Sequence, residues 1–223
     1  MDQTLPELEE TITACRRCPR LVLWREQVAR EKRRAYRDQE YWGKPVPGFG
    51  DPLARLLIVG LAPGAHGSNR TGRMFTGDAS GDFLYPALYR AGFASQPQAS
   101  HRADSLTLHD CFISAVGRCA PPNNKPTRDE IANCLPYLKQ EMNLLSNLQG
   151  IVTLGSVAFN ETLTLLGVKS TSYTFGHGLF YEPGSGLPWL LASYHPSRQN
   201  TQTGRLTTDM FDSIWKTVQE KLQ

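Results

Sequence analysis

The stretch that decides the fold is an apolar run followed by a glycine-rich loop: Leu56-Leu57-Ile58-Val59, then Gly60-Leu61-Ala62-Pro63-Gly64-Ala65-His66-Gly67-Ser68-Asn69-Arg70-Thr71-Gly72-Arg73-Met74-Phe75-Thr76-Gly77-Asp78. The apolar run is typical of a parallel strand that is buried on both faces. Open α/β sheets bind ligands beyond the carboxyl ends of their strands. We therefore expect the loop to form the floor of a functional site, with an ordinary glycine-rich connection as the alternative.

The rest of the chain repeats the alternation of strands and helices. Strands are expected over residues 55–60, 111–116, 150–154 and 189–193, and helices over 80–91, 127–148, 156–166 and from 208 onward. Thr127 and Glu130 form a capping-box pattern that marks the start of the second of these helices. The alternation predicts a parallel sheet with helices on both faces.

Length and composition point to an ordinary globular protein. The chain has 223 residues, 40% of them hydrophobic and 20% charged, and we expect one domain over residues 1–223. Its apolar runs are too short to cross a bilayer, and the acidic N-terminus lacks the apolar segment of a signal peptide. A cytoplasmic location with no membrane contact is expected. The five cysteines should then be reduced, which favours a metal site or buried thiols over disulfides.

Positive charge is concentrated near the N-terminus. Residues 16–37 hold nine basic residues against two glutamates, although the net charge of the whole chain is only +3. Such a segment can meet a phosphate backbone, and a solvated helix face is the alternative. Leu21, Trp24 and Val28 lie at helical spacing, so we expect them to dock this helix and leave its arginines outward.

Four cysteines have the pattern of a metal site. Cys15 and Cys18 are two residues apart, a spacing that presents two thiolates to one metal, and Cys119 and Cys134 follow later. Four cysteines can hold zinc or a [4Fe–4S] cluster, and spacing alone does not decide between them. Cys111 lies on an expected strand, where a buried small hydrophobe is the simpler interpretation.

The glycine-rich loop resembles the first motif of the uracil-DNA glycosylase superfamily. It is most similar to family 5 (type b) of the iron–sulfur branch, whose loop reads GLAPGAHGSNRTGRPFTGD, with Met74 here in place of proline. Residues 195–207, which begin His195-Pro196-Ser197, resemble the second motif of the family. The cysteine spacing is also that of the family, so the resemblance extends from Cys15 to Thr207.

The resemblance implies a fold, a cofactor and an activity. The fold is a three-layer α/β/α sandwich around a central four-stranded parallel sheet. The cofactor is a [4Fe–4S] cluster that anchors the N-terminal helical segment through Cys15, Cys18, Cys119 and Cys134. The activity is that of a monofunctional, monomeric DNA glycosylase, which flips uracil and other deaminated bases such as hypoxanthine out of DNA and hydrolyses the N-glycosidic bond with water. A strict uracil enzyme of family 4 and a catalytically inactive Fe–S DNA-binding module are the alternatives.

Each catalytic role falls on a residue of these motifs. Phe75 is expected to stack on the flipped base, and a core phenylalanine is the alternative. His195 is expected to donate a hydrogen bond to the departing base, for which a neutral imidazole is sufficient. Ala65 stands where family 4 has an acidic residue. The resemblance to family 5 instead implies that Asp78, the nearest carboxylate, orients the water with assistance from Asn124. The alternative for Asp78 is a helix N-cap.

The remaining assignments concern the base and the DNA backbone. Family 4 reads the edge of uracil with an asparagine where this chain has Ala115, so we expect a wider and more permissive site. The residues assigned to base binding are Gly60, Ala62, Gly64, Phe75, Ala115 and Asn200. Those assigned to DNA contacts are Ser68, Arg70, Arg73, Ser197 and Arg198.

Overall fold

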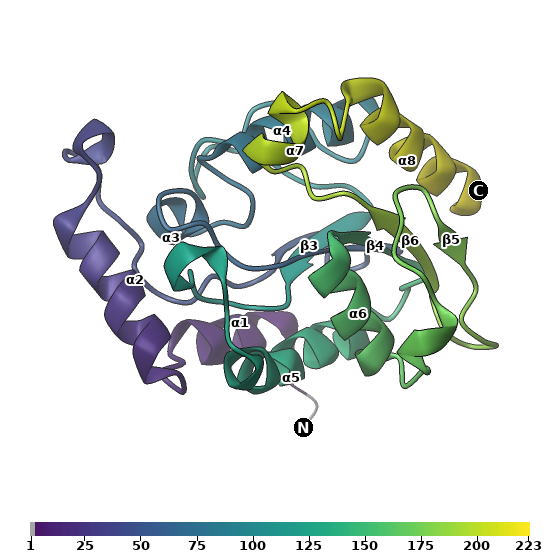
Figure 1. Ribbon diagram of the computed structural model, residues 1–223, viewed down its shortest axis with the longest axis horizontal. Helices are drawn as coiled ribbons and strands as arrows, with labels where there is room; N and C mark the ends of the chain where they lie inside the picture. The colour runs from purple at the N-terminus through teal and green to yellow at the C-terminus, as the bar shows by residue number, and fades with distance from the viewer. Residues whose placement is uncertain (1–2) are drawn as a thin grey trace.

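The computed structural model describes residues 3–223 of the chain, so the first two residues of the expected 1–223 domain lie outside the described range. The structure has three layers, with a sheet between two layers of helices (Figure 1). The strands are β1 (Phe49–Gly50), β2 (Leu56–Gly60), β3 (Cys111–Ala115), β4 (Gly150–Leu154), β5 (Phe180–Tyr181) and β6 (Trp189–Ser193). Their order in the sheet is β1-β3-β2-β4-β6-β5.

The four central strands confirm the predicted parallel sheet. β3, β2, β4 and β6 are all parallel, and Gly60 at the end of β2 pairs in register with Ala115 at the end of β3. The sheet nevertheless has six strands, because two-residue strands β1 and β5 add antiparallel edges. The sequence pattern missed both edges, since two residues are too few to show an alternation of polar and apolar side chains.

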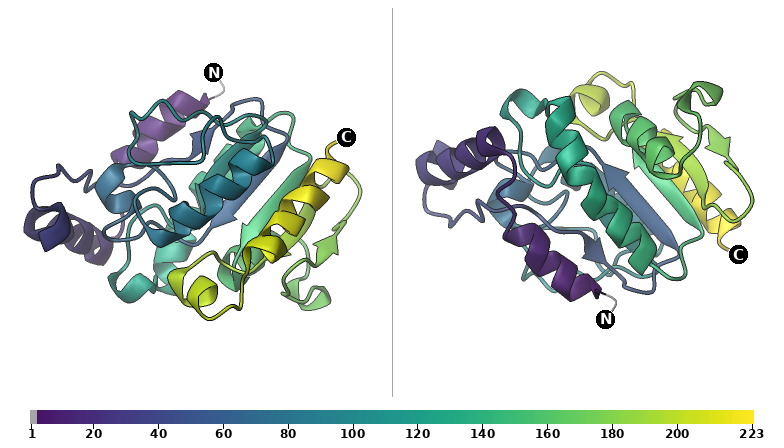
Figure 2. Two further views of the ribbon diagram at one scale, coloured as in Figure 1. Left: turned by 90° about the horizontal axis from the view of Figure 1, so that it is seen from above. Right: turned by 90° about the horizontal axis from the view of Figure 1, so that it is seen from below.

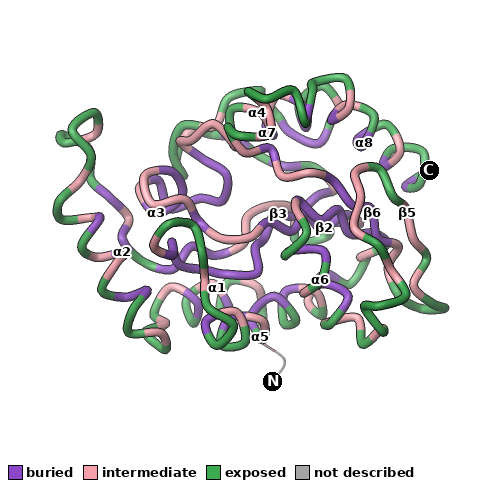
Figure 3. The backbone as a smooth tube through the Cα atoms, viewed as in Figure 1, coloured by how far each residue is buried: buried purple, intermediate pink, exposed green. Residues whose placement is uncertain are grey.

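Each face of the sheet is covered by helices, as Figure 2 shows from above and below. One face packs against α4 (Ala79–Arg90) and α8 (Thr208–Lys221), whose buried side chains include Leu84, Tyr85 and Trp215. The other face packs against α5 (Arg128–Leu144) and α6 (Ser156–Leu165), with Leu138 and Phe159 in its core. Buried residues, purple in Figure 3, are concentrated along the central strands.

Most predicted element bounds are close to the observed ones. β4 and β6 match the expected residues, and the capping box is present: Thr127 N–H donates to Glu130 and Glu130 N–H donates to the Thr127 hydroxyl. Helix α5 ends at Leu144, four residues before the expected position 148. The chain leaves the helix there because Gln149 and Gly150 donate their backbone N–H groups to Arg55 O, which starts β4 beside β2.

The N-terminal segment contains α1 (Leu5–Thr13), α2 (Pro19–Glu31) and the short η1 (Arg34–Tyr36), and α1 packs on α5. Leu21, Val22 and Val28 dock α2, but the expectation that all its arginines face outward is wrong for Arg25, which is only 2% exposed. Arg25 follows Leu21 by four residues and precedes Val28 by three, so it lies on the docking face. No helix in the described range 3–223 has the length and apolar character needed to span a bilayer.

Candidate active site

The floor of the site is formed where β2 and β3 end. The Phe75 ring lies directly against Gly60, because a methyl group added to that glycine would stand 2.5 Å from Phe75 Cζ. Phe75 and Ala115 are both buried and belong to the same core cluster. The absence of a side chain at Gly60 therefore lets an aromatic ring cover the end of β2. The burial of Phe75 agrees with the alternative of a core phenylalanine, and its stacking on a base stays a prediction.

His195 reaches the same place from β6, two residues after Ser193. Its ring centroid is 5.9 Å from that of Phe75, and the two ring planes are inclined by 31°. Burial lowers the pKa of His195 to about 4, so the imidazole is neutral near pH 7. The Asn200 side chain donates to His195 O at 2.8 Å and ties the following loop to the histidine.

Asp78 has two environments, one for each carboxylate oxygen. Oδ1 accepts hydrogen bonds from the N–H groups of Ser80 (3.0 Å) and Gly81 (3.2 Å), so Asp78 is the N-cap of α4. Oδ2 is turned toward the glycine-rich loop, where a methyl group at Gly67 would collide with it. The N-cap alternative is thus correct for Oδ1, whereas Oδ2 faces the glycine-rich loop and takes no part in the cap.

Burial raises the pKa of Asp78, and the hydrogen bonds from Gly81 and Ser80 oppose this rise only in part. A carboxylate in this position is a stronger base than an ordinary aspartate. It also lies at the positive end of α4, which favours its charged form.

The other predicted base-binding residues surround this floor. Ala62 is half-buried beside Gly117, and Gly64 O accepts hydrogen bonds from the N–H groups of Gly67 and Asn69 within the loop. Asn124 is exposed in η2 (Pro122–Asn124), with φ of 55°. Its exposure leaves it accessible to a ligand.

The residues predicted to contact DNA have different environments. Arg198 is exposed at the first position of α7 (Arg198–Gln202), and Ser197 is the N-cap of that helix. Ser68 is buried at the start of α3 (Ser68–Thr71). Arg70 is half-buried: it donates to His66 O at 2.8 Å and to Gly77 O at 2.9 Å, so it links the middle of the loop to its C-terminal end.

The predicted contact between Arg73 and a DNA phosphate is wrong. The Arg73 side chain is 3% exposed and forms a bidentate ion pair with Asp104, with N–O distances of 2.7 and 2.6 Å. A guanidinium held in this way has no face open to the DNA backbone. Arg73 instead forms an ion pair inside the protein.

The four predicted metal ligands lie in the N-terminal segment, in the loop after β3 and in helix α5. Cys18 is the N-cap of α2, Cys119 follows β3, and Cys134 lies inside α5. Burial raises the pKa of Cys119 to about 12, and negative charge on Cys134 and Cys15 would act on it in the same direction. Burial also raises the pKa of Cys134, and negative charge on Cys18 and Cys15 would act in the same direction.

Polar side chains already point at these sulfurs. Arg25 Nη1 lies 3.0 Å from Cys119 Sγ, and Asn133 Nδ2 lies 3.5 Å from Cys18 Sγ. Arg20 holds the same end of α2 to α5 through a bidentate pair with Glu130. Across residues 3–223, no three His, Cys, Asp or Glu side chains are grouped tightly enough to hold a single metal ion.

Sequence reasoning missed Arg25, Tyr85 and Asp104. Arg25 could have been found from its spacing with Leu21 and Val28. Tyr85 donates its hydroxyl proton to Met74 O beside Phe75, and Asp104 binds Arg73. No local pattern signals the last two contacts. Tyr85 lies 11 residues after Met74, and Asp104 lies in an irregular loop 31 residues after Arg73.

Comparison with known proteins agrees with this geometry. The family model of the uracil DNA glycosylase superfamily matches residues 47–219. A type-5 uracil-DNA glycosylase of Thermus thermophilus is 55% identical to this chain over 202 residues, which cover 91% of each protein. A type-5 enzyme of Mycobacterium leprae is 52% identical over 96% of this chain and 93% of its own length. A type-4 uracil-DNA glycosylase of Pyrobaculum aerophilum is 31% identical over 86% of this chain and 83% of its own length.

A doubly covered parallel sheet with this match defines the class: the chain belongs to the uracil DNA glycosylase superfamily. The class is one of enzymes that hydrolyse N-glycosyl bonds. Within it, the higher identity to the type-5 relatives places the chain in the type-5 family rather than in family 4.

Proposed function

We propose that this protein removes uracil and at least one deaminated purine from DNA by hydrolysis, as the first step of base excision repair. The observation that carries the proposal is the pairing of the Phe75 and His195 rings, 5.9 Å apart beyond the ends of β2 and β6, with Asp78 Oδ2 turned toward the glycine-rich loop that also carries Phe75. A glycosylase needs a surface for the flipped base, a donor for the departing base and a group that directs water. These three side chains have the chemistry for those three tasks.

The flipped base stacks on Phe75, and His195 donates a hydrogen bond to it. Cleavage of the N-glycosidic bond leaves negative charge on the base and positive charge on the sugar. A neutral imidazole can donate its N–H to the base as the negative charge develops, and burial of the ring strengthens this interaction. Burial of His195 keeps it in this neutral form.

Asp78 accounts for the other half of the reaction. Its Oδ2 can accept a hydrogen bond from a water molecule above the glycine-rich loop and take the proton of that water as the oxygen bonds to the sugar. Its negative charge also stabilises the positive charge on the sugar. Asn124, exposed after β3, assists as a second hydrogen-bonding group for the water.

We propose that the cysteine set holds a [4Fe–4S] cluster, and the environment of Arg25 supports this. The buried Arg25 guanidinium is aimed at Cys119 Sγ, while its nearest carboxylate, on Glu26, is 4.0 Å away. A buried cation in this position would be balanced by thiolates. Cys15, Cys18, Cys119 and Cys134 would hold the cluster, whose contribution is to fasten the N-terminal segment to the loop after β3. We propose that the enzyme acts in the cytoplasm as a monomer on DNA.

The proposed range of bases rests on Ala115. This residue is 2% exposed at the end of β3, directly paired with Gly60 on the floor of the site. Alanine offers no side-chain hydrogen bond to a base edge. A site that hydrogen-bonds a base edge through a polar side chain discriminates between bases by about four to five powers of ten. Ala115 cannot provide such a hydrogen bond. Recognition therefore falls on backbone groups, which accept more than one base.

Duplexes that carry one uracil, hypoxanthine or xanthine test the proposal. After incubation with the enzyme, alkali cleaves the strand at each abasic site, and the products are counted. We expect cleavage at uracil and at hypoxanthine. Cleavage at uracil alone would contradict the broad range, and no cleavage at any base would favour an inactive DNA-binding module.

The variant Ala115→Asn should narrow the base range. Asparagine adds a donor and an acceptor at the floor and reduces its volume, so we expect the rate on hypoxanthine to fall by at least about tenfold more than the rate on uracil. Single-turnover rates on the two duplexes measure the ratio. Equal losses on both bases would indicate that position 115 only maintains packing.

The rate of excision should depend on pH through Asp78. Its pKa is raised above the ordinary aspartate value, and the charged form is the active one, so the rate should fall as the pH drops toward that pKa. His195 already has a pKa of about 4 and should add no titration near neutrality. Single-turnover rates in buffers from about pH 4 to pH 8 measure the profile. A rate that rises on acidification would contradict the proton acceptor role of Asp78.

A further inference from the structure

Phe75 has a backbone conformation that phenylalanine rarely adopts. Its φ is 53°, in the left-handed region. Such a conformation costs free energy in a bulky residue and persists only where the surroundings impose it. The groups that fix the backbone next to Phe75 therefore determine where its ring lies.

Tyr85 holds the peptide that precedes Phe75. The Tyr85 side chain is fully buried on α4, and its hydroxyl donates to Met74 O at 2.7 Å. The Thr76 hydroxyl donates to the same carbonyl oxygen at 3.2 Å. Met74 O is the acceptor of the peptide group between Met74 and Phe75, so these bonds set the orientation of that peptide.

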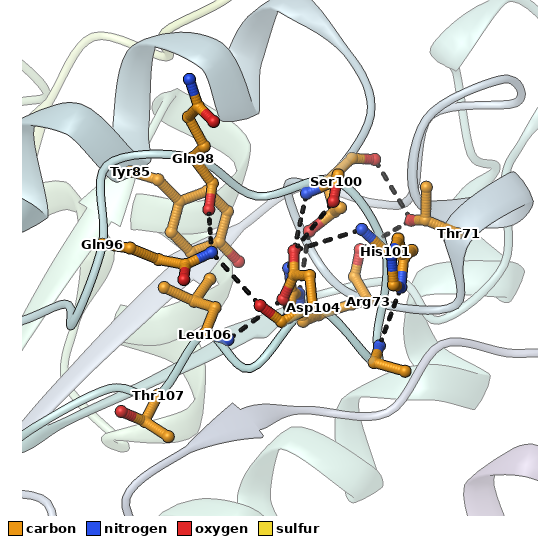
Figure 4. A network of polar contacts seen from close by, with 12 residues as sticks. Thr71, Arg73, Tyr85, Gln96, Gln98, Ser100, His101, Asp104, Leu106 and Thr107 are labelled. Carbon is orange, nitrogen blue, oxygen red and sulfur yellow. Dashed lines mark hydrogen bonds and ion pairs between the residues drawn. The ribbon is translucent and has the colours of Figure 1, made fainter.

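Arg73 fixes the loop at Thr76, the residue that follows Phe75. Its Nε donates to the Thr76 hydroxyl at 3.1 Å, and its Nη atoms form the bidentate pair with Asp104. Figure 4 shows Arg73 and Asp104 side by side within the surrounding polar network. The hydrogen bonds of Arg73 and Tyr85 thus meet at Thr76 and Met74, which flank Phe75.

Asp104 is itself fixed by the backbone of its own loop. Its carboxylate accepts hydrogen bonds from the N–H groups of Ser100, His101 and Leu106, at 2.7, 3.2 and 3.1 Å. Burial alone would raise its pKa, but Arg73 and these N–H groups hold that pKa well below the ordinary range. The Arg73 guanidinium accordingly has a charged and rigid partner.

We propose that Arg73, Tyr85 and Asp104, here called the brace, are positioning residues that hold Phe75 in the orientation that stacks on a flipped base. This inference rests on the proposed role of Phe75. The Tyr85 and Arg73 side chains are buried, and the Asp104 side chain is 7% exposed and paired with Arg73, so the three act on a base through Phe75 and not by direct contact. The brace acts through Phe75 and determines how firmly an extruded base is held.

The test is a double-mutant cycle between Tyr85→Phe and Phe75→Ala. Tyr85→Phe removes one hydroxyl and keeps the ring, so the core stays filled. A duplex with uracil beside 2-aminopurine reports extrusion of the uracil by a rise in fluorescence, and the single-turnover rate reports excision. We expect Tyr85→Phe to lower the maximal rate by about fivefold or more and to reduce the fluorescence rise, with unchanged affinity for DNA.

In the Phe75→Ala background, the same change at Tyr85 should have no further effect, because the residue through which it acts is gone. Tyr89→Phe is the matched control: Tyr89 is on the same helix and is 48% exposed. Asp104→Asn should reduce extrusion as well, whereas Asp212→Asn, the same change in the Arg90–Asp212 pair between α4 and α8, should not. Thermal melting of each variant reports its stability separately.

Wild-type extrusion and rate in Tyr85→Phe would overturn the inference. A loss that is undiminished in the Phe75→Ala background would also overturn it, since Tyr85 would then act on another part of the fold. If the wild-type protein excised no base, the proposed function would fail, while the fluorescence measurement would still decide whether the brace controls extrusion.

Discussion

Asp78→Asn should slow single-turnover excision of uracil by about a hundredfold while leaving thermal stability almost unchanged. Asparagine caps a helix as well as aspartate does, so the bonds that Oδ1 accepts from Ser80 and Gly81 are kept. The amide cannot take a proton from water, and it carries no charge to stabilise the sugar.

The comparison variant is Asp78→Ala, which loses the cap together with the carboxylate. We expect it to be as slow as Asp78→Asn and also less stable, by about 1 kcal/mol for the lost cap. Thermal melting and single-turnover rates of the two variants therefore separate the two roles of Asp78. A wild-type rate in Asp78→Asn would show that this carboxylate does not handle the water.

Cys119→Ser should remove the iron and most of the soluble protein. The wild-type protein purified without air is expected to be brown and to contain about four irons, as a Cys-ligated [4Fe–4S] cluster does. Without the cluster, Arg25 becomes a buried cation with no thiolate to balance it. Such a charge is strongly destabilising.

The matched control for this variant is Cys111→Ser. Cys111 is buried on β3, and the only polar contact of its thiol among the described residues is a weak one to Phe93 O. Iron analysis and visible absorption should show the full iron content in Cys111→Ser and little in Cys119→Ser. Stoichiometric zinc without iron in the wild-type protein would contradict the cluster.

The sequence predicted the central sheet well because its strands are short runs of buried apolar residues. β4 and β6 were located to the residue. The edges β1 and β5 were missed because each is only two residues long and is fixed by its neighbour in the sheet. The local sequence pattern therefore predicts the buried central strands. It does not predict short edge strands, which form only because they pair with a neighbouring strand.

The two wrong assignments concern arginines. Arg25 and Arg73 were both expected to face outward or toward DNA, as charged residues usually do. Their partners are Cys119 and Asp104, which lie 94 and 31 residues further along the chain. A sequence shows the charge of a residue but not a distant partner that permits its burial. Asp78 is the opposite case, because a helix cap is a local feature and the sequence already offered it as the alternative for this residue.

The two uses of Asp78 have a genetic consequence. An aspartate codon becomes an asparagine codon by a single G-to-A change, and unrepaired deamination of cytosine in the complementary strand produces this change. The resulting protein would keep its helix cap and fold normally, so proteases that remove unstable proteins would not eliminate it. The lesion that the enzyme is proposed to repair can thus inactivate its own gene while the folded product still accumulates in the cell.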